Sequence, residues 1–421
     1  MNSSPAVPAP IDAAERIHAL DVIRGFALLG ILLMNIEYFQ KPMQAVIFGF
    51  DGSQTGADHW VAWASYVFVQ GKFYTMFSLL FGIGFVIFLD RAFARGASAR
   101  LLFLRRLGGL LLFGVAHAFL VWSGDILLIY ALVGVLLLLF AKTPARRLWK
   151  WGLAFVLVAP AMMWLGAFGM EFALNSPEGP KILADIEAQR ASIMADIEHG
   201  HAVYAGAGYM EAVQWRIHEW TALYGGGGWL FFAASVLGMF LIGASFGRAG
   251  TFAVPAASRA LFVRLSIVGF IVGIPAALYV GLNGGAADMM VPTYAGAKVV
   301  SAATIANLAL CLAYVSTLAL LLQRAAAARW LSTLGPAGRM ALTNYLAQSL
   351  VFTLLFYGYG AGLYGEYGRA ATTVMALAFF ALQVWFSGWW LMRYRIGPCE
   401  WLWRTMTYGR AQPLRFAAVP N

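Results

Sequence analysis

The chain has 421 residues, of which 61% are hydrophobic and only 11% are charged, whereas soluble domains carry about 25% charged residues. Together with a mean hydropathy of +0.72, this composition excludes a soluble enzyme, a disordered protein and a nucleic-acid-binding module. The net charge of +10 is better explained by basic segments beside membrane spans, which fix the orientation of a membrane protein. The sequence therefore predicts an all-α, polytopic transmembrane helical bundle.

Residues 1–15, at the start of the chain, are rich in Pro and Ala, and this composition predicts a disordered tail. Apolar runs near or above roughly 18 residues are typical of membrane spans, and the chain contains about ten such runs. We expect spans at 20–39, 71–90, 102–122, 125–141, 149–169, 229–247, 261–282, 294–322, 340–358 and 371–391. The first run lacks a convincing small-residue cleavage site, so we interpret it as a retained helix and not as a signal peptide.

These spans divide the chain into two membrane parts around one long polar segment. Spans one to five lie within 16–170, an extracytoplasmic segment occupies 171–228, spans six to ten lie within 229–392, and a basic cytoplasmic tail forms 393–421. With both termini in the cytoplasm, about three quarters of the 29 lysines and arginines fall on the cytoplasmic side, as the positive-inside rule requires. This imbalance predicts an even number of spans and two cytoplasmic termini.

The segment 171–228 is acidic, and its stretch 180–199 has isoleucines at a spacing that is typical of an amphipathic helix. It could form a solvated cap on the outer face, or a lid over an outward-opening cavity. In either case Gly225–Gly228 would serve as a hinge.

An outer layer of polar residues is predicted near the extracytoplasmic ends of the first spans, where polar groups are costly and often functional. A histidine beside a carboxylate is held in one tautomer and becomes a better base, which is the chemistry that His117 and Asp125 would supply together. Asn35 could donate a hydrogen bond to a developing oxyanion. Structural alternatives remain open: Asp125 as a helix N-cap, His117 as a packing residue, Asn35 as a bridge between helices, and Lys72 as a side chain that reaches the outer headgroups.

An inner layer of charged residues is predicted at the cytoplasmic ends of the spans and in the tail. It could be a structural ion-pair network, or it could hold an anionic ligand such as a nucleotide phosphate. Asn344 lies four residues before Gln348 on one helical face, which favours hydrogen bonding between helices, with the lining of a polar cavity as the alternative. The candidate ligand-binding residues are Asp21, Arg24, Arg105, Arg106, Arg339, Asn344, Glu400 and Arg404.

Other features of the sequence carry less information. The two cysteines, Cys311 and Cys399, are far apart and the six histidines are scattered singly, so we expect neither a disulfide framework nor a metal site. Gly243 and Gly247 form a Gly-x-x-x-Gly pair, a weak signal for close helix packing that would suit the face of a homodimer.

Several motifs resemble those of the YeiB family of bacterial inner-membrane proteins, and the resemblance covers nearly the whole chain. It implies a multi-pass protein of the bacterial inner (plasma) membrane, in a family without an assigned function. The matching stretches are Leu20–Ile31 followed by Asn35, Lys72–Gly82, His117 with Gly124–Leu127, Gly338–Leu346 and Gly397–Arg404.

The first span is also similar to that of lysosomal heparan-alpha-glucosaminide N-acetyltransferase, which belongs to a transmembrane acyltransferase superfamily. Both begin with Asp-x-x-Arg-Gly, here from Asp21, and both have an Asn near the outer end, here Asn35. The resemblance implies transfer of an acyl group from cytoplasmic acyl-CoA to an acceptor across the membrane. The superfamily's histidine corresponds by position to His59, whose flanking residues match poorly, whereas His117 belongs to the YeiB-type pattern.

Three functions follow as hypotheses. In a membrane acyltransferase, the inner arginines would hold acyl-CoA, His117 or His59 would be the base, and the acceptor would be a periplasmic small molecule, lipid or glycan. In a proton-coupled transporter, His117 and Asp125 would carry the proton. In a non-catalytic scaffold, the chain would bind only membrane lipids.

Overall fold

A computed structural model describes residues 17–50, 52–94, 98–225, 229–284 and 290–416. The predicted N-terminal tail 1–15 and residues 226–228 of the predicted hinge lie outside the described residues. Within the described ranges the secondary structure is helical, and the one strand-like feature is an isolated bridge between Tyr394 and Arg415. The predicted all-α class is therefore confirmed.

The helices follow the predicted spans closely. Eight helical stretches are long and apolar enough to cross a membrane: His18–Tyr38, Gly56–Ala94, Ala99–Val121, Ala145–Leu174, Trp229–Arg248, Arg259–Asn283, Tyr294–Leu321 and Arg369–Arg393. Two shorter apolar helices, Leu127–Phe140 and Ala341–Phe356, occupy the positions of the fourth and ninth predicted spans. The count of ten spans and the cytoplasmic location of the termini stay predictions.

Some of these stretches consist of two or more elements. The helices that the text uses are α1 (His18–Tyr38), α2 (Gly56–Phe68), α3 (Lys72–Ala94), α4 (Ala99–Ala116), α5 (Leu127–Leu136), α7 (Val158–Leu174), α8 (Gly179–Gly206), α9 (Tyr209–Gly225), α10 (Trp229–Arg248), α14 (Gly335–Arg339), α15 (Ala341–Phe356), α16 (Arg369–Arg393) and α17 (Pro398–Tyr408), with the 3₁₀ helix η2 (Met43–Phe48) and the π-helical segment η3 (His117–Val121). The remaining α-helices are α6 (Ala145–Val156), α11 (Arg259–Asn283), α12 (Tyr294–Leu321) and α13 (Ala325–Leu331).

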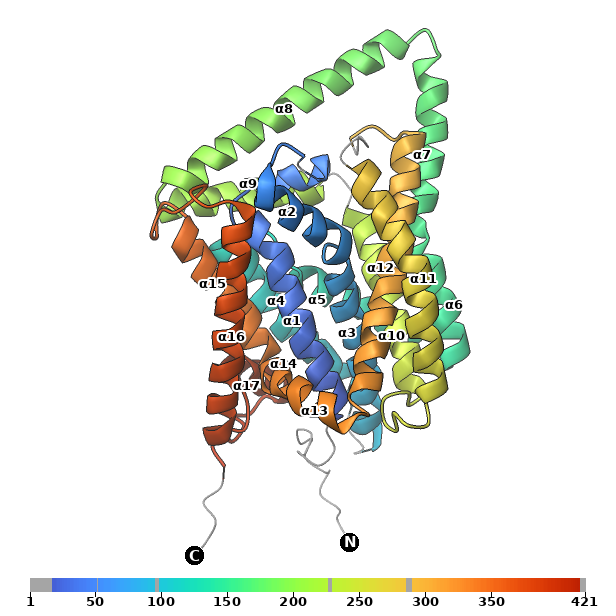
Figure 1. Cartoon of the computed structure of the whole chain (residues 1–421), viewed down its shortest axis with the longest axis vertical. Coiled ribbons are helices and arrows are strands. Elements are labelled where there is room, and N and C mark those ends of the chain that lie inside the picture. The colour runs from blue at the N-terminus through green and yellow to red at the C-terminus, as the bar shows by residue number, and fades with distance from the viewer. Residues whose placement is uncertain (1–16, 51, 95–97, 226–228, 285–289, 417–421) are drawn as a thin grey trace, which may run out of the picture.

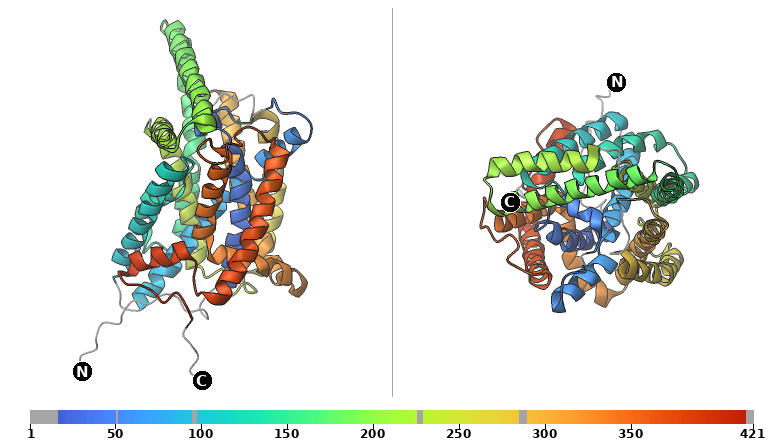
Figure 2. Two further views of the ribbon diagram at one scale, coloured as in Figure 1. Left: turned by 90° about the vertical axis from the view of Figure 1, so that its left-hand side faces the viewer. Right: turned by 90° about the horizontal axis from the view of Figure 1, so that it is seen from above.

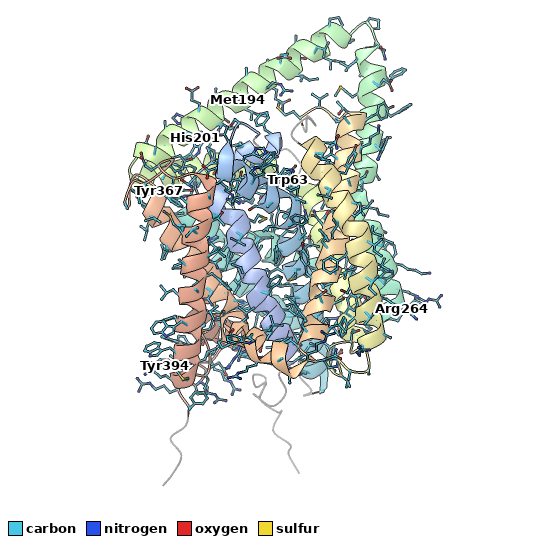
Figure 3. The ribbon with its side chains drawn as sticks, in the orientation of Figure 1. Trp63, Met194, His201, Arg264, Tyr367 and Tyr394 are labelled. Carbon is cyan, nitrogen blue, oxygen red and sulfur yellow. The ribbon has the colours of Figure 1, made fainter. Side chains whose placement is uncertain are left out.

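The two ends of the bundle differ in what covers them (Figure 1). At one end lie the start of α1, α14 and α17, together with Arg264 and Tyr394 (Figure 3); we call it the arginine-rich end. Across the opposite end run α8 and α9, which lie side by side when the molecule is seen from above (Figure 2); we call these two helices the cap. The predicted stretch 180–199 is thus helical, and its Ile197 is buried.

Glycines allow α3 and α10 to pack closely. A Cβ atom on Gly82 would lie 1.9 Å from the Phe240 carbonyl oxygen, and one on Gly243 would lie 2.0 Å from that of Leu79. Small residues bring helix backbones together in this way. The Gly243–Gly247 pair is therefore used inside the chain, and it does not provide the homodimer face that its motif suggested. A homodimer stays a prediction without this support.

Candidate functional site

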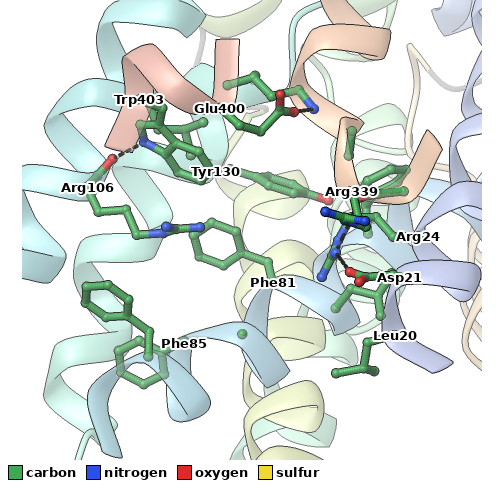
Figure 4. Close-up of a pocket in the computed structure, with 18 of the residues that line it drawn as sticks. Leu20, Asp21, Arg24, Phe81, Phe85, Arg106, Tyr130, Arg339, Glu400 and Trp403 are labelled. Atoms are coloured by element: carbon green, nitrogen blue, oxygen red, sulfur yellow. Dashed lines mark hydrogen bonds and ion pairs between the residues drawn. The ribbon is translucent and has the colours of Figure 1, made fainter. Parts of the chain in front are cut away.

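A cavity of about 320 Å³ lies at the arginine-rich end, between α1, α3, α4, α14, α15 and α17 (Figure 4). Its size falls in the range of roughly 300–1,000 Å³ that is typical of small-molecule sites. The walls are largely apolar, with Phe77, Leu80, Phe81 and Phe85 contributed by α3. Five arginines also line it, and we call them the arginine cluster: Arg24, Arg91, Arg106, Arg339 and Arg404.

Close helix packing places the arginine cluster. A Cβ on Gly338 would lie 1.9 Å from the Asp21 carbonyl oxygen, so α14 approaches α1 closely. Within α1, the Arg24 guanidinium lies 2.8 Å from the Asp21 carboxylate. The Arg106 guanidinium lies 3.8 Å from the centre of the Trp403 ring, whose indole N–H donates to the Arg106 carbonyl at 2.7 Å. Asp21 and Arg24 thus form an ion pair, as the structural alternative for the inner layer suggested, and the same residues line the cavity.

The arginine cluster carries positive charge that the protein does not fully neutralise. Among the described residues, neither Arg106 nor Arg404 forms an ion pair. Burial lowers the pKa of Arg404, which shows that its environment disfavours the charged form. Such a cluster is suited to an anionic group with several oxygens, because arginine binds phosphate and carboxylate with paired N–H donors.

Three of the predicted ligand-binding residues have other positions or partners. The Glu400 carboxylate lines the cavity but accepts the backbone N–H of Leu342 at 2.7 Å and the Thr343 hydroxyl at 2.7 Å, so it holds the start of α15. Burial raises the pKa of Glu400. The Asn344 amide donates to the Ala337 carbonyl and the Ser387 hydroxyl. Arg105 is exposed. Neither Asn344 nor Arg105 lines the cavity.

The helix-bridging interpretation of the polar face on α15 is confirmed. Gln348 donates to Gln383 at 2.8 Å, and Gln383 in turn donates to the Asn344 carbonyl at 2.9 Å. These hydrogen bonds join α15 to α16.

The predicted pair of His117 and Asp125 forms, and we call it the dyad. His117 Nδ1 lies 2.7 Å from one Asp125 carboxylate oxygen, and each residue is 2% exposed. The other oxygen accepts the Leu128 N–H at 2.7 Å, at the start of α5. Asp125 thus combines the predicted capping role with the orientation of His117, which stands at the start of the π-helical segment η3. Such segments occur frequently at functional sites.

The His117 ring of the dyad packs against Tyr345, a second buried polar residue. Among the described residues, His117 Nε2 and the Tyr345 hydroxyl are buried without a hydrogen-bond partner, and the two rings are 5.1 Å apart between centroids. Because the carboxylate can only accept, Nδ1 carries the proton and Nε2 keeps a lone pair. Tyr345 also lines the cavity. The dyad therefore lies one side chain away from the cavity wall.

The other members of the predicted outer layer do not join the dyad. Asn35 is 5% exposed but does not line the cavity, and among the described residues no hydrogen bond links its side chain to His117. His59, on α2, packs against Phe50 and Trp60. Lys72 is 2% exposed, so the expectation that it reaches the headgroups is wrong: its stem and ammonium lie within the protein.

Comparison with known proteins identifies the family. The chain is 34% identical over 413 residues to the uncharacterized protein YxaH of Bacillus subtilis (strain 168), covering 95% of this chain and 96% of the relative. It is 31% identical over 417 residues to the uncharacterized protein YeiB of Escherichia coli (strain K12), covering 95% and 98%. The chain belongs to the YeiB family. A family model described as a protein of unknown function (DUF418) matches residues 246–410, and no solved structure matches the chain significantly.

The stretches that resemble the YeiB family meet at the cavity. Each of these stretches contributes some of the residues that line the cavity. They come from Leu20–Ile31, Lys72–Gly82, Gly338–Leu346 and Gly397–Arg404, and Ile126 and Leu127 come from the His117-containing pattern. In chain order, the first three stretches lie before residue 130 and the last two after residue 335. Their convergence on one cavity makes the cavity, together with the dyad, the best candidate for the functional site of this YeiB-family protein.

Two charged residues of the cap were missed by the sequence reasoning. Arg216 and Glu219 on α9 are each 0% exposed. The Glu219 carboxylate accepts hydrogen bonds from Ser123, Tyr204 and the Met43 backbone N–H, and Ser123 lies two residues before Asp125. In the sequence, opposite charges three residues apart look like a solvated helix face, so no local signal distinguishes them.

Proposed function

We propose that this YeiB-family protein is a membrane acyltransferase that takes acyl-CoA from the arginine-rich end, which would face the cytoplasm, and acylates an acceptor from the opposite side. The observation that carries this proposal is that a single cavity extends from the arginine cluster to Tyr345, whose ring contacts His117. A donor with a multiply charged head and a thioester on a long arm matches this combination of a cationic mouth and apolar walls.

The residues at the mouth fit the phosphates of CoA. Arg106 and Arg404 have no ion-pair partner among the described residues, and Arg24 and Arg339 also line the cavity. The phenylalanines of α3 and the side chains of Ile126 and Leu127 would enclose the arm. Acyl-CoA would supply a thioester carbonyl that is already activated for transfer.

The dyad supplies the proton transfers. His117 Nε2 removes the proton from the acceptor hydroxyl or amine as that atom forms a bond to the thioester carbon, and it then returns the proton to the sulfur as the C–S bond breaks. Asp125 keeps the proton on Nδ1 and stabilises the imidazolium. The Tyr345 hydroxyl, which is buried without a partner, donates to the oxyanion, the role that Asn35 was predicted to play.

The test of donor binding compares two adjacent arginines. We expect acetyl-CoA and CoA, but not ATP, to raise the thermal stability of the purified protein, by about 2.7 kcal/mol at a ligand concentration of 100 Kd. Arg106→Gln should weaken binding roughly 10- to 100-fold, since a charge-assisted hydrogen bond contributes about 1.5–3 kcal/mol. Arg105→Gln is the matched control, because Arg105 is exposed and does not line the cavity. Absence of any shift at millimolar CoA would contradict the proposal.

Transfer itself is tested with His117→Ala. We expect this variant to keep the stability shift with CoA, and to lose acyl transfer to periplasmic small molecules, lipids or glycans by roughly 10²- to 10⁴-fold, the usual contribution of a general base. A variant with unchanged transfer would remove the dyad from the mechanism.

A second candidate, proton-coupled transport, is favoured by one observation. The cavity lies at one end of the bundle while the dyad, each residue 2% exposed, is covered at the other, as in one state of an alternating-access cycle. In that case a small-molecule or lipid substrate would stabilise the protein, CoA would not, and Asp125→Asn would uncouple uptake from protons.

A further inference from the structure

Helix α9 of the cap covers the dyad from the side opposite to the cavity. Arg216 donates to the Leu120 carbonyl at 3.1 Å, and the Tyr209 hydroxyl donates to the same carbonyl at 2.9 Å. Trp220 lies 5.6 Å from Phe119 between ring centroids. Leu120 and Phe119 belong to η3, the segment that begins with His117. The contacts of α9 therefore fall directly on the element that carries the base.

A second set of contacts holds the other side of the dyad. The Glu219 carboxylate accepts the Ser123 hydroxyl, in the turn between His117 and Asp125, and also the Tyr204 hydroxyl of α8 and the Met43 N–H of η2. Arg216 and Glu219 do not pair with each other in the described structure. Each residue instead forms hydrogen bonds with neutral groups of neighbouring elements, and the bonds to Leu120, Ser123 and Met43 tie α9 to the bundle.

The interface beneath α9 differs from an apolar core. Arg216 donates to the Tyr359 hydroxyl at 2.7 Å and lies 5.8 Å from the Tyr357 ring centre. Among the described residues, Arg216 Nε, the Tyr357 hydroxyl, the Trp215 indole N–H and both polar side-chain atoms of Gln44 are buried without a partner. Each such group lacks a protein hydrogen-bond partner while α9 is in place, which is unfavourable for a buried polar group. Opening would return these groups to water, which offsets the loss of the bonds to Leu120 and Ser123.

We propose that α9 is the gate through which the acceptor reaches the dyad, with Arg216 and Glu219 as the two residues that latch it shut. In the latched state the dyad is buried, one side chain away from the cavity wall, and release of the latch admits an extracytoplasmic molecule next to His117 Nε2. The inference rests on the proposed function for the identity of that molecule as an acceptor. The gate itself concerns access and is independent of which chemistry the dyad performs.

The test measures access to position 117 from each side of the membrane. His117→Cys is made in a Cys311→Ala, Cys399→Ser background, and a membrane-impermeant, charged thiosulfonate is applied to right-side-out or inverted vesicles. We expect slow labelling from the cap side, and labelling at least about tenfold faster when Arg216→Met and Glu219→Leu, whose side chains cannot form these hydrogen bonds, are added. The matched control is Asp185→Asn with Glu187→Gln, on the exposed part of α8, which should leave the rate unchanged. Equal rates in folded latched and unlatched proteins would overturn the gate.

A measurement on the wild-type chain covers the case in which the double variant fails to fold. Amide hydrogen exchange should show Tyr209–Gly225 and His117–Trp122 opening together, at least about tenfold faster than α10. Protection of α9 equal to that of α10 would also overturn the gate. Neither experiment contains CoA. Loss of the CoA response with a working gate would therefore reject the acyltransferase alone, and the reverse would reject the gate alone.

Discussion

The arginine-rich end and the cap end treat charge in opposite ways. At the arginine-rich end, five arginines line a cavity, and at least Arg106 and Arg404 lack an ion pair in the described structure. At the cap end, Arg216 and Glu219 are 0% exposed and are held by neutral hydrogen-bonding groups. The arginines of the cavity are available to bind an anionic ligand, whereas Arg216 and Glu219 form hydrogen bonds that hold two parts of the protein together. The dyad is buried between them, one side chain away from the cavity wall.

The largest effect is expected at the point where the two ends meet. Asp125→Ala leaves the Leu128 N–H and the His117 Nδ1–H buried without partners, so we expect a loss of about 3–5 kcal/mol in the free energy of unfolding. Asp125→Asn should cost less, because its carbonyl can still accept from Leu128. Thermal unfolding in detergent measures both, with Asp185→Ala on the exposed side of α8 as the control. An unchanged midpoint for Asp125→Ala would mean that the dyad does not join the two ends.

At the cap end, removal of one charge should loosen the cap and leave the bundle intact. Arg216→Met leaves the Leu120 carbonyl with one donor fewer and removes the ring contacts, and we expect a cost of about 1.5–3 kcal/mol. Arg216→Lys should recover only part of this, because lysine lacks the planar fork that serves Leu120 and Tyr359 together. Hydrogen exchange localises the effect. A loss spread evenly over α3 and α10 would show that the cap is an ordinary part of the core and would remove the contrast between the ends.

The inner charged layer and the dyad could be predicted because local sequence fixes much of their geometry. Asp21 and Arg24 are three residues apart on one helix, and the Ser123-Gly124 turn brings Asp125 back towards His117. The dyad's pairing follows from this turn together with an oriented helix.

The rest of the site depends on contacts between distant elements. Tyr345 looks like a packing residue on an apolar helix, and only its position against His117 singles it out. The surroundings of His59, which packs against Phe50 and Trp60 and does not line the cavity, likewise depend on tertiary contacts. Arg216 and Glu219 lie on a segment without a recognisable motif, and burial by η2, η3 and α8 sets their role. Lys72 was misjudged for the same reason: its burial comes from neighbouring helices.

Ionic strength should separate the two ends without any mutation. Raising the salt concentration from 0.1 M to 1 M shortens the screening length from about 10 Å to about 3 Å, so CoA should bind the arginine cluster several-fold more weakly. The latch is buried, so labelling of His117→Cys from the cap side should change by less than about twofold in the same range. Isothermal titration and the labelling rates measure the two responses. Equal salt dependence would indicate that both ends are open to solvent.

The smallest expected effect is the pH dependence of the cap. Burial raises the pKa of Glu219, and the hydrogen bonds from Ser123, Tyr204 and Met43 and the charge of Arg216 partly oppose this rise. A raised pKa means that the folded cap binds the proton more tightly than the open form, so the contribution of Glu219 to closure is greatest at acid pH and is lost as pH rises through its folded value.

His201 acts in the opposite sense, since burial lowers its pKa and its contribution to closure is lost as pH falls. The difference between wild type and Glu219→Gln isolates the carboxylate from this background. We expect α9 in the wild type to exchange its amides relatively more slowly at pH 5 than at pH 7.5, after correction for intrinsic rates, and we expect this component to vanish in Glu219→Gln. If the variant keeps the full pH response, a titratable group other than Glu219 controls closure, and the latch would rest on Arg216 alone.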